Sequence, residues 1–150
     1  MTLKILYGVQ GTGKGHISRT HMMAKSFQQY KVDVTYLFSG REEDQFFDME
    51  IFGNYLYRKG FTLHVNKEQI DVISTVRKNS LFRLVSDIRQ IDLSGYGLVL
   101  YDFEPVTDWA TRLQNNPILG TGHQYAFGPN TPKNWRNLSI RAYHEILCTN

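Results

Sequence analysis

The stretch Lys4-Ile5-Leu6-Tyr7-Gly8-Val9-Gln10-Gly11-Thr12-Gly13-Lys14-Gly15-His16 opens the chain and decides its fold. Its apolar run Ile5–Tyr7 predicts a buried strand, and the glycines that follow predict a loop with little side-chain bulk. Apolar residues then recur at helical spacing from Ile17 to Phe27. Strand, glycine loop and helix in this order are typical of parallel sheets whose first helix presents backbone N–H groups to an anionic or sugar-like ligand.

Further strands are predicted where β-branched and aromatic residues cluster. Residues 32–38 form the expected second strand, and residues 98–101 are continuously apolar, as in a strand covered on both faces. Short strands are also expected at Tyr55–Tyr57, at Phe61–Val65 and from Ile118 onward.

Helices are predicted between these strands. Ser80 is expected to cap a helix that packs on the sheet through an apolar stripe of Leu81, Leu84, Val85 and Ile88. Pro105 suits the first position of another helix. Apolar periodicity also marks residues 67–78 and a final amphipathic helix over residues 135–146, and residues 41–52 are expected to form a short helix. This alternation predicts one α/β domain over residues 1–150, with a doubly wound, mostly parallel sheet and helices on both faces.

Composition narrows the class of protein. The chain has 150 residues with 41% hydrophobic content and a net charge of +3, which fits one folded, mildly basic domain. Basic residues are scattered among acidic ones, which argues against a nucleic-acid surface. The single Cys148 excludes an internal disulfide and offers no zinc-ligand spacing. No apolar leader or bilayer-length span stands out, so we expect a cytoplasmic protein.

The glycine loop has three competing interpretations. Gly8 followed by Gly13-Lys14 matches the phosphate-loop pattern G-x-x-x-x-G-K, with Asp102 on the acidic strand, but Gly15 stands where a magnesium-binding hydroxyl belongs. A dinucleotide fingerprint is weaker, because the third glycine falls one residue early. The third interpretation makes the loop a platform for a neutral or phosphorylated acceptor, with His16 as the reactive group.

Three runs carry a resemblance to a known family: the glycine loop with His16, then Asp102-Phe103-Glu104-Pro105, then Gly122-His123-Gln124-Tyr125. They resemble the amino-terminal half of GT-B glycosyltransferases, most closely the group related to the N-acetylglucosaminyltransferase of peptidoglycan synthesis. The resemblance spans nearly the whole chain, and Lys14 departs from the usual small or amide residue. It implies an acceptor-side, Rossmann-like half that lacks its donor-binding partner, an inverting reaction, and neither cofactor nor obligatory metal.

Candidate catalytic residues fall where strands end. Ligands of such sheets bind at the carboxyl ends of the strands, so we expect His16, Asp102, Glu104 and His123 to converge. His16 is the predicted base, oriented by Asp102 or else by Glu104, although either carboxylate could instead cap a helix or form an ion pair. The predicted substrate-binding residues are Gly11, Thr12, Gly13, Lys14, Gly15, Arg41, His123 and Gln124.

The leading function is therefore transfer of a sugar from a nucleotide-sugar to the hydroxyl of a sugar or glycolipid acceptor. A nucleotide-binding protein that uses Lys14 and a non-catalytic ligand-binding or interaction domain are the alternatives. Contact with the inner face of a membrane and self-association through the face of a missing partner are open expectations.

Overall fold

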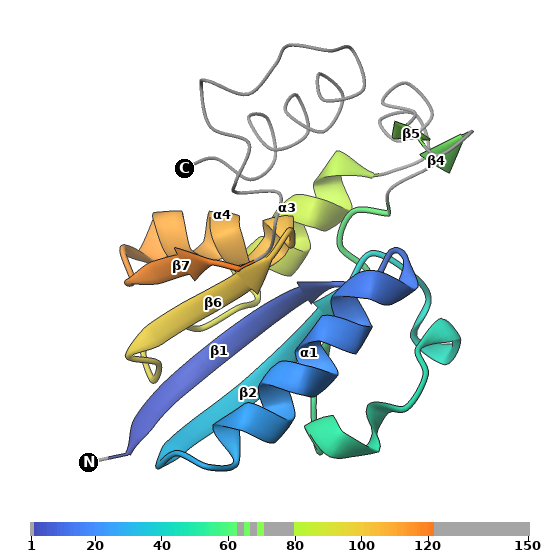
Figure 1. Ribbon diagram of the computed structural model, residues 1–150. Coiled ribbons are helices and arrows are strands. Elements are labelled where there is room, and N and C mark those ends of the chain that lie inside the picture. Colours follow the sequence, from blue (N-terminus) through green and yellow to red (C-terminus); the bar gives the residue numbers. More distant parts are fainter. Residues whose placement is uncertain (1, 63–64, 67–68, 71–79, 122–150) are drawn as a thin grey trace, which may run out of the picture.

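The computed structural model describes residues 2–62, 65–66, 69–70 and 80–121, and its centre is a five-stranded, all-parallel sheet (Figure 1). The strand order is β3-β2-β1-β6-β7. The bounds are β1 (Leu3–Gln10), β2 (Val32–Ser39), β3 (Leu56–Tyr57), β6 (Leu98–Asp102) and β7 (Ile118–Gly120). The expected parallel α/β sheet is confirmed, and its order changes direction between β1 and β6, where such sheets bind ligands.

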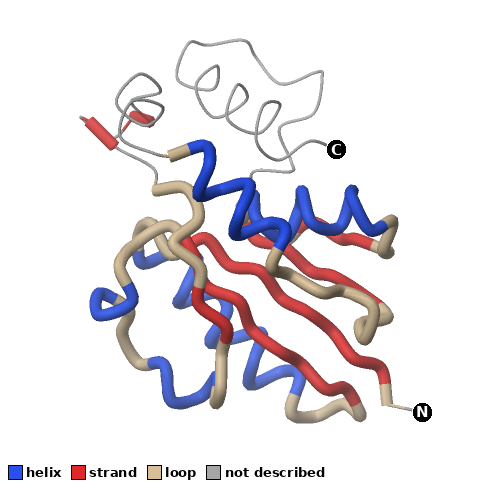
Figure 2. The backbone as a smooth tube through the Cα atoms, turned by 180° about the vertical axis from the view of Figure 1, so that it is seen from behind, coloured by secondary structure: helices blue, strands red, loops and turns tan. Residues whose placement is uncertain are grey.

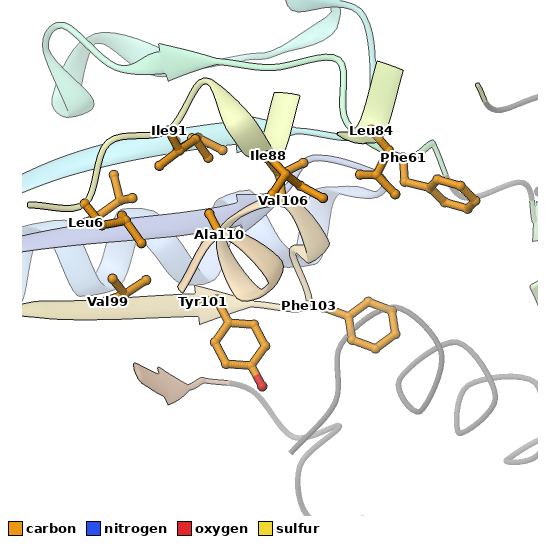
Figure 3. Packing of buried hydrophobic residues seen from close by; sticks show 12 residues of the cluster. Leu6, Phe61, Leu84, Ile88, Ile91, Val99, Tyr101, Phe103, Val106 and Ala110 are labelled. Carbon is orange, nitrogen blue, oxygen red and sulfur yellow. The ribbon is translucent and has the colours of Figure 1, made fainter. Parts of the chain in front are cut away.

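Helices cover both faces of this sheet, as predicted (Figures 1 and 2). Helix α1 (Lys14–Phe27) lies on one face, and α3 (Leu81–Arg89) and α4 (Pro105–Gln114) lie together on the other. Successive side chains of β1 point to opposite faces of the sheet: Ile5 and Tyr7 pack with α1, whereas Leu6 packs with α3 and α4. Figure 3 shows the cluster on the α3–α4 side, which includes Leu6 of β1, Ile88 of α3 and Ala110 of α4.

Gly8 lies inside strand β1 and outside the loop in which it was expected. It pairs with Leu37 of β2 and Tyr101 of β6. A Cβ atom at this position would lie 2.1 Å from Oγ1 of Thr107, so the glycine allows α4 to approach the strand closely. The strand continues to Gln10, which leaves only residues 11–13 between β1 and α1. The prediction that Gly8, Gly11, Gly13 and Gly15 all belong to one loop is therefore wrong.

Two further expectations along the chain are corrected. Residues 41–52 form two short 3₁₀ turns, η1 (Glu43–Gln45) and η2 (Met49–Phe52), because Asp48 between them takes a left-handed conformation with φ 51°. Phe61 is buried in the α3–α4 core, and residues 61–62 belong to no strand, so the strand expected at residues 61–65 does not begin at Phe61; residues 63–64 lie outside the described part of the chain. Val65, the last residue of the expected strand, begins β4 (Val65–Asn66), which forms a separate antiparallel pair with β5 (Gln69–Ile70).

Helix α3 begins at its predicted cap, since Ser80 Oγ accepts a hydrogen bond from the N–H of Arg83. Its buried face differs from the prediction: Leu84 and Ile88 are buried, but Leu81 and Val85 are exposed. Asp87 also belongs to the buried face, where it accepts a 2.9 Å hydrogen bond from the N–H of Gly60, so this face runs through positions 84, 87 and 88.

Helix α4 begins at Pro105, as predicted. Among the described residues, no helix combines the length and the hydropathy that crossing a bilayer requires. The expected helix at residues 135–146 and most of the periodic segment at residues 67–78 lie outside the described part of the chain.

Candidate functional site

The reversal of strand order brings His16 and Asp102 together. Asp102 is the last residue of β6, and His16 lies in the first turn of α1, directly after β1. Nδ1 of His16 lies 3.0 Å from Oδ1 of Asp102. The Asp102 side chain is fully buried, whereas the His16 side chain keeps 15% of its surface exposed. The predicted convergence of these two residues therefore occurs at the edge of the sheet where a ligand can reach the imidazole.

Arg19 is the second partner of Asp102, and the sequence analysis missed it. Its Nη1 donates to Oδ2 of Asp102 at 2.5 Å, so each carboxylate oxygen receives one side chain of α1. His16 and Arg19 are three residues apart and therefore share one face of the helix. That spacing is the signal from which Arg19 could have been found, once Asp102 was expected opposite His16.

The imidazole of His16 also contacts an aromatic side chain, that of Phe103. Its ring stacks on that of His16, with centroids 6.1 Å apart and an interplanar angle of 5°. Phe103 also has a positive φ of 58°, which is a costly conformation for a bulky residue. The left-handed turn lets the preceding Asp102 face α1 while the following Glu104 faces Ser39 and α4.

Glu104 is turned away from His16 and caps α4. Oε1 accepts from Ser39 Oγ at 2.6 Å and from the Val106 N–H at 2.9 Å. Oε2 accepts from both the N–H and the hydroxyl of Thr107 at 2.7 Å. Burial raises the pKa of the Glu104 carboxyl, and the hydrogen bonds from Ser39, Thr107 and Val106 act in the opposite direction. These contacts give Glu104 a part in the fold, and none of them reaches the imidazole.

The glycine loop divides into a packed part and an open part. Gly11 donates its N–H to the Ser39 carbonyl at 2.6 Å, and a Cβ there would lie 2.4 Å from the Phe46 ring. Thr12 donates to the Gly40 carbonyl at 2.9 Å, so both residues hold the loop against the end of β2. Gly13 and Gly15 have open space where a Cβ would lie, and α1 has no side-chain cap. The part that can face a ligand is thus Gly13-Lys14-Gly15, all exposed.

Of the remaining predicted binding residues, Arg41 is described, and its described contacts lie elsewhere. Arg41 donates from Nη1 to the Gln45 carbonyl at 3.2 Å, and its own carbonyl accepts from the Tyr57 hydroxyl, so its described contacts lie in the segment after β2. His123 and Gln124 lie outside the described residues. Across the described ranges, no group of three or more His, Cys, Asp or Glu side chains could hold a metal ion.

The His16–Asp102 contact has a definite chemical consequence. A neutral imidazole that donates its Nδ1 proton to a carboxylate keeps the Nε2 lone pair available. The carboxylate also stabilises the ring once Nε2 has taken a proton. The arrangement can therefore accept a proton from a hydroxyl group that approaches the exposed side of the ring.

Comparison with known proteins gives a family match. A family model described as glycosyl transferase family 1 matches residues 3–130. No curated protein matches the chain, and neither does any solved structure.

Proposed function

This chain belongs to glycosyl transferase family 1, and from that premise we propose that it is the acceptor-side half of an enzyme that moves a sugar from a nucleotide-linked donor to an acceptor hydroxyl. The observation that carries the proposal is the 3.0 Å contact between Nδ1 of His16 and Oδ1 of Asp102 at the carboxyl edge of the sheet. A buried carboxylate that orients a partly exposed imidazole is the pairing that a general base requires.

In the proposed reaction, Nε2 of His16 takes the proton of the acceptor hydroxyl. The acceptor oxygen forms a new bond to the anomeric carbon of the donor sugar, and the bond from that carbon to the nucleotide phosphate breaks. The nucleotide leaves with the electron pair, and a single displacement of this kind inverts the anomeric centre. Asp102 stabilises the imidazolium that forms at His16. No step requires a metal ion or a cofactor.

The open part of the glycine loop fits the approach of the acceptor. Gly13 and Gly15 leave room beside the backbone, and the uncapped start of α1 favours negative charge on a ligand. With the resemblance to the peptidoglycan group, this leads us to propose a glycolipid acceptor that carries phosphate. The proposal places most of the donor contacts in a second α/β half and the reaction in the cytoplasm.

A lipid-linked acceptor also suggests that the protein touches the membrane surface. Phe82 of α3 is 92% exposed and Leu113 of α4 is 68% exposed, and Leu113 shares a groove of about 300 Å³ with Val85 and Trp109. Arg89 lines the same groove. Apolar side chains beside exposed cations suit an anionic membrane surface. Self-association through this face is the competing proposal.

The nucleotide-binding alternative has less support. A phosphate loop needs its first glycine at the start of the loop. Gly8 instead lies inside strand β1, where it pairs with β2 on one side and with β6 on the other. Only residues 11–13 separate β1 from the helix that begins at Lys14.

Substitution of the proposed base tests the function. We expect His16→Ala to lower turnover by about 10²–10⁴-fold, the usual contribution of a general base, with an unchanged melting temperature. The assay is sugar transfer from a panel of nucleotide-linked sugars to lipid-linked and soluble acceptors, with the chain in the longest natural form that carries it. Ser18→Ala, at an exposed position on the same helix, is the matched control.

Three results would contradict the proposal. Near-normal transfer by His16→Ala would remove His16 from the role of base. Tight, magnesium-dependent ATP or GTP binding that is lost in Lys14→Ala, without any transfer, would favour the nucleotide-binding alternative. Sugar or nucleotide binding without transfer in any form of the protein would favour a non-catalytic domain.

A further inference from the structure

Asp102 has two basic partners, and the second has no place in the reaction described above. We propose that Arg19 is a positioning residue: it holds Asp102 toward His16 and offsets the negative charge that this carboxylate presents to the imidazole. The catalytic consequence of this inference rests on the proposed function, but the charge effect on His16 does not.

The geometry of the carboxylate carries the positioning part. Asp102 is fully buried at the end of β6, and its two oxygens are taken by two donors one helical turn apart on α1. Because Arg19 occupies Oδ2, the carboxylate is fixed with Oδ1 toward Nδ1 of His16. A single contact to the imidazole would leave the carboxylate free to rotate about its Cβ–Cγ bond. The planar guanidinium is well suited to hold such a group.

The charges around the imidazole carry the second part. A buried carboxylate with no other partner favours the protonated form of a neighbouring imidazole, and a protonated ring cannot accept a proton. The guanidinium of Arg19 lies on the opposite oxygen of the same carboxylate and opposes that effect. It is a fixed positive charge, because arginine stays protonated in proteins.

The other groups that the structure describes near the ring do not replace Arg19. Tyr7 of β1 lies within the electrostatic reach of Asp102 and Arg19, but burial raises the pKa of its hydroxyl, so Tyr7 stays neutral at physiological pH. Phe103, which covers the ring, has no charge. Glu104 faces Ser39 and Thr107, and Lys14, two residues before His16, is exposed to solvent. Among the described residues, Arg19 is therefore the cation bound to the carboxylate that His16 contacts.

Two variants separate charge from hydrogen bonding. Arg19→Gln keeps a donor and removes the charge, whereas Arg19→Lys keeps the charge and removes the planar fork. Lys25→Gln, an exposed position in the last turn of the same helix, is the matched control for loss of one positive charge. If Arg19→Gln does not fold, Arg19→Met serves as the neutral variant.

The first measurement is an NMR titration of the His16 ring in the isotope-labelled 150-residue chain, which needs no substrate. We expect the ring to gain its proton at a higher pH in Arg19→Gln than in the parent protein, and at the parent value in Arg19→Lys and Lys25→Gln. The ring nitrogen shifts should show the proton on Nδ1 in the parent. An unchanged titration in Arg19→Gln would overturn the inference.

The second measurement is the pH profile of kcat/KM for sugar transfer. In Arg19→Gln the acid limb should move to higher pH by the same amount as the His16 titration, so that the loss is largest in acid and recovers in alkali. A lower melting temperature with an unshifted profile would mean that Arg19 only ties α1 to the sheet, and would overturn its positioning role. A shifted His16 titration in a protein without transfer would instead reject the proposed function and leave the charge effect intact.

Discussion

At the end of β6, two carboxylates separated by one residue have different roles. Asp102 faces α1, and Glu104 faces the interior, where it caps α4. The contact between Asp102 and His16 could be predicted from the sequence, because the carboxyl ends of adjacent parallel strands meet at one edge. The left-handed turn at Phe103 could not, since local preference reserves positive φ for glycine and asparagine. Because this turn could not be predicted, both carboxylates were candidate partners of His16 in the sequence analysis.

The cap at Glu104 leads to a prediction about stability. In Glu104→Ala, the buried N–H groups of Val106 and Thr107 lose their acceptor, as does the hydroxyl of Ser39. Because each unsatisfied buried donor costs about 1–3 kcal/mol, we expect the free energy of unfolding to fall by at least about 2 kcal/mol. Urea denaturation followed by circular dichroism measures this change.

The matched control for that prediction is Ser80→Ala, which removes the exposed cap of α3 and should cost about 1 kcal/mol. A loss in Glu104→Ala no larger than that of Ser80→Ala would show that the buried acceptor is dispensable. Loss of transfer without any loss of stability would return Glu104 to the catalytic set.

At the scale of single elements, β1 shows why glycine does not always indicate a loop. The apolar run Ile5–Tyr7 was enough to predict the strand, but the strand extends from Leu3 to Gln10. Gly8 and Gln10 are poor strand formers by local preference, and their places are decided by distant residues. Thr107 of α4 packs where a Cβ of Gly8 would lie, and the side-chain amide of Gln10 donates to the Phe61 carbonyl. A short-range pattern contains neither contact.

The start of α1 provides a prediction in which stability and activity change in opposite directions. Gly15 lies in the helix with open space around the position of a Cβ and without a positive φ. Gly15→Ala should therefore raise the free energy of unfolding by up to about 1 kcal/mol, because alanine favours helix over glycine. The added methyl group would stand where the acceptor is proposed to approach, so we expect a higher KM for the acceptor.

Thermal melts measure the change in stability, and acceptor titrations of the same preparations measure the KM for the acceptor. Gly95→Ala adds a methyl group at another open glycine, in the turn before β6, and should leave KM unchanged. An unchanged KM in Gly15→Ala would mean that the acceptor does not pass this part of the loop.

At the scale of the whole molecule, the alternation of strands and helices predicted the doubly wound sheet, because parallel neighbours need a crossover segment between them. The segment between β2 and α3 was the least predictable. Its two 3₁₀ turns are short, and β3 has two residues paired to the edge of β2. Such short elements are stabilised by side-chain packing, as in the contact of the Phe52 and Phe38 rings with centroids 4.9 Å apart. They are too short to produce a periodic pattern in the sequence.

The α3–α4 face carries the last prediction. Leu81 and Val85 were expected to pack on the sheet, but they are 57% and 44% exposed. Phe82, next to Leu81 in the chain, is almost fully exposed. Exposed apolar side chains at this density are typical of a contact surface. The two basic residues of α3, Arg83 and Arg89, are also exposed, and its one acidic residue, Asp87, is buried. The outward charge of this helix is therefore positive, which favours an anionic membrane surface over a neutral one.

We expect the protein to sediment with vesicles that contain anionic phospholipid, less with purely zwitterionic vesicles, and less as salt is raised. Phe82→Ser should weaken this partition at least about tenfold, since burying a phenylalanine side chain contributes about 1.5–3 kcal/mol. Tyr30→Ser, at a 66% exposed aromatic residue that follows α1 on the other side of the sheet, should leave the partition unchanged. If vesicles do not bind but Phe82→Ser abolishes a concentration-dependent dimer in analytical ultracentrifugation, the face joins two copies of this chain. Equal partition of all three proteins would mean that the apolar face plays no part in membrane contact.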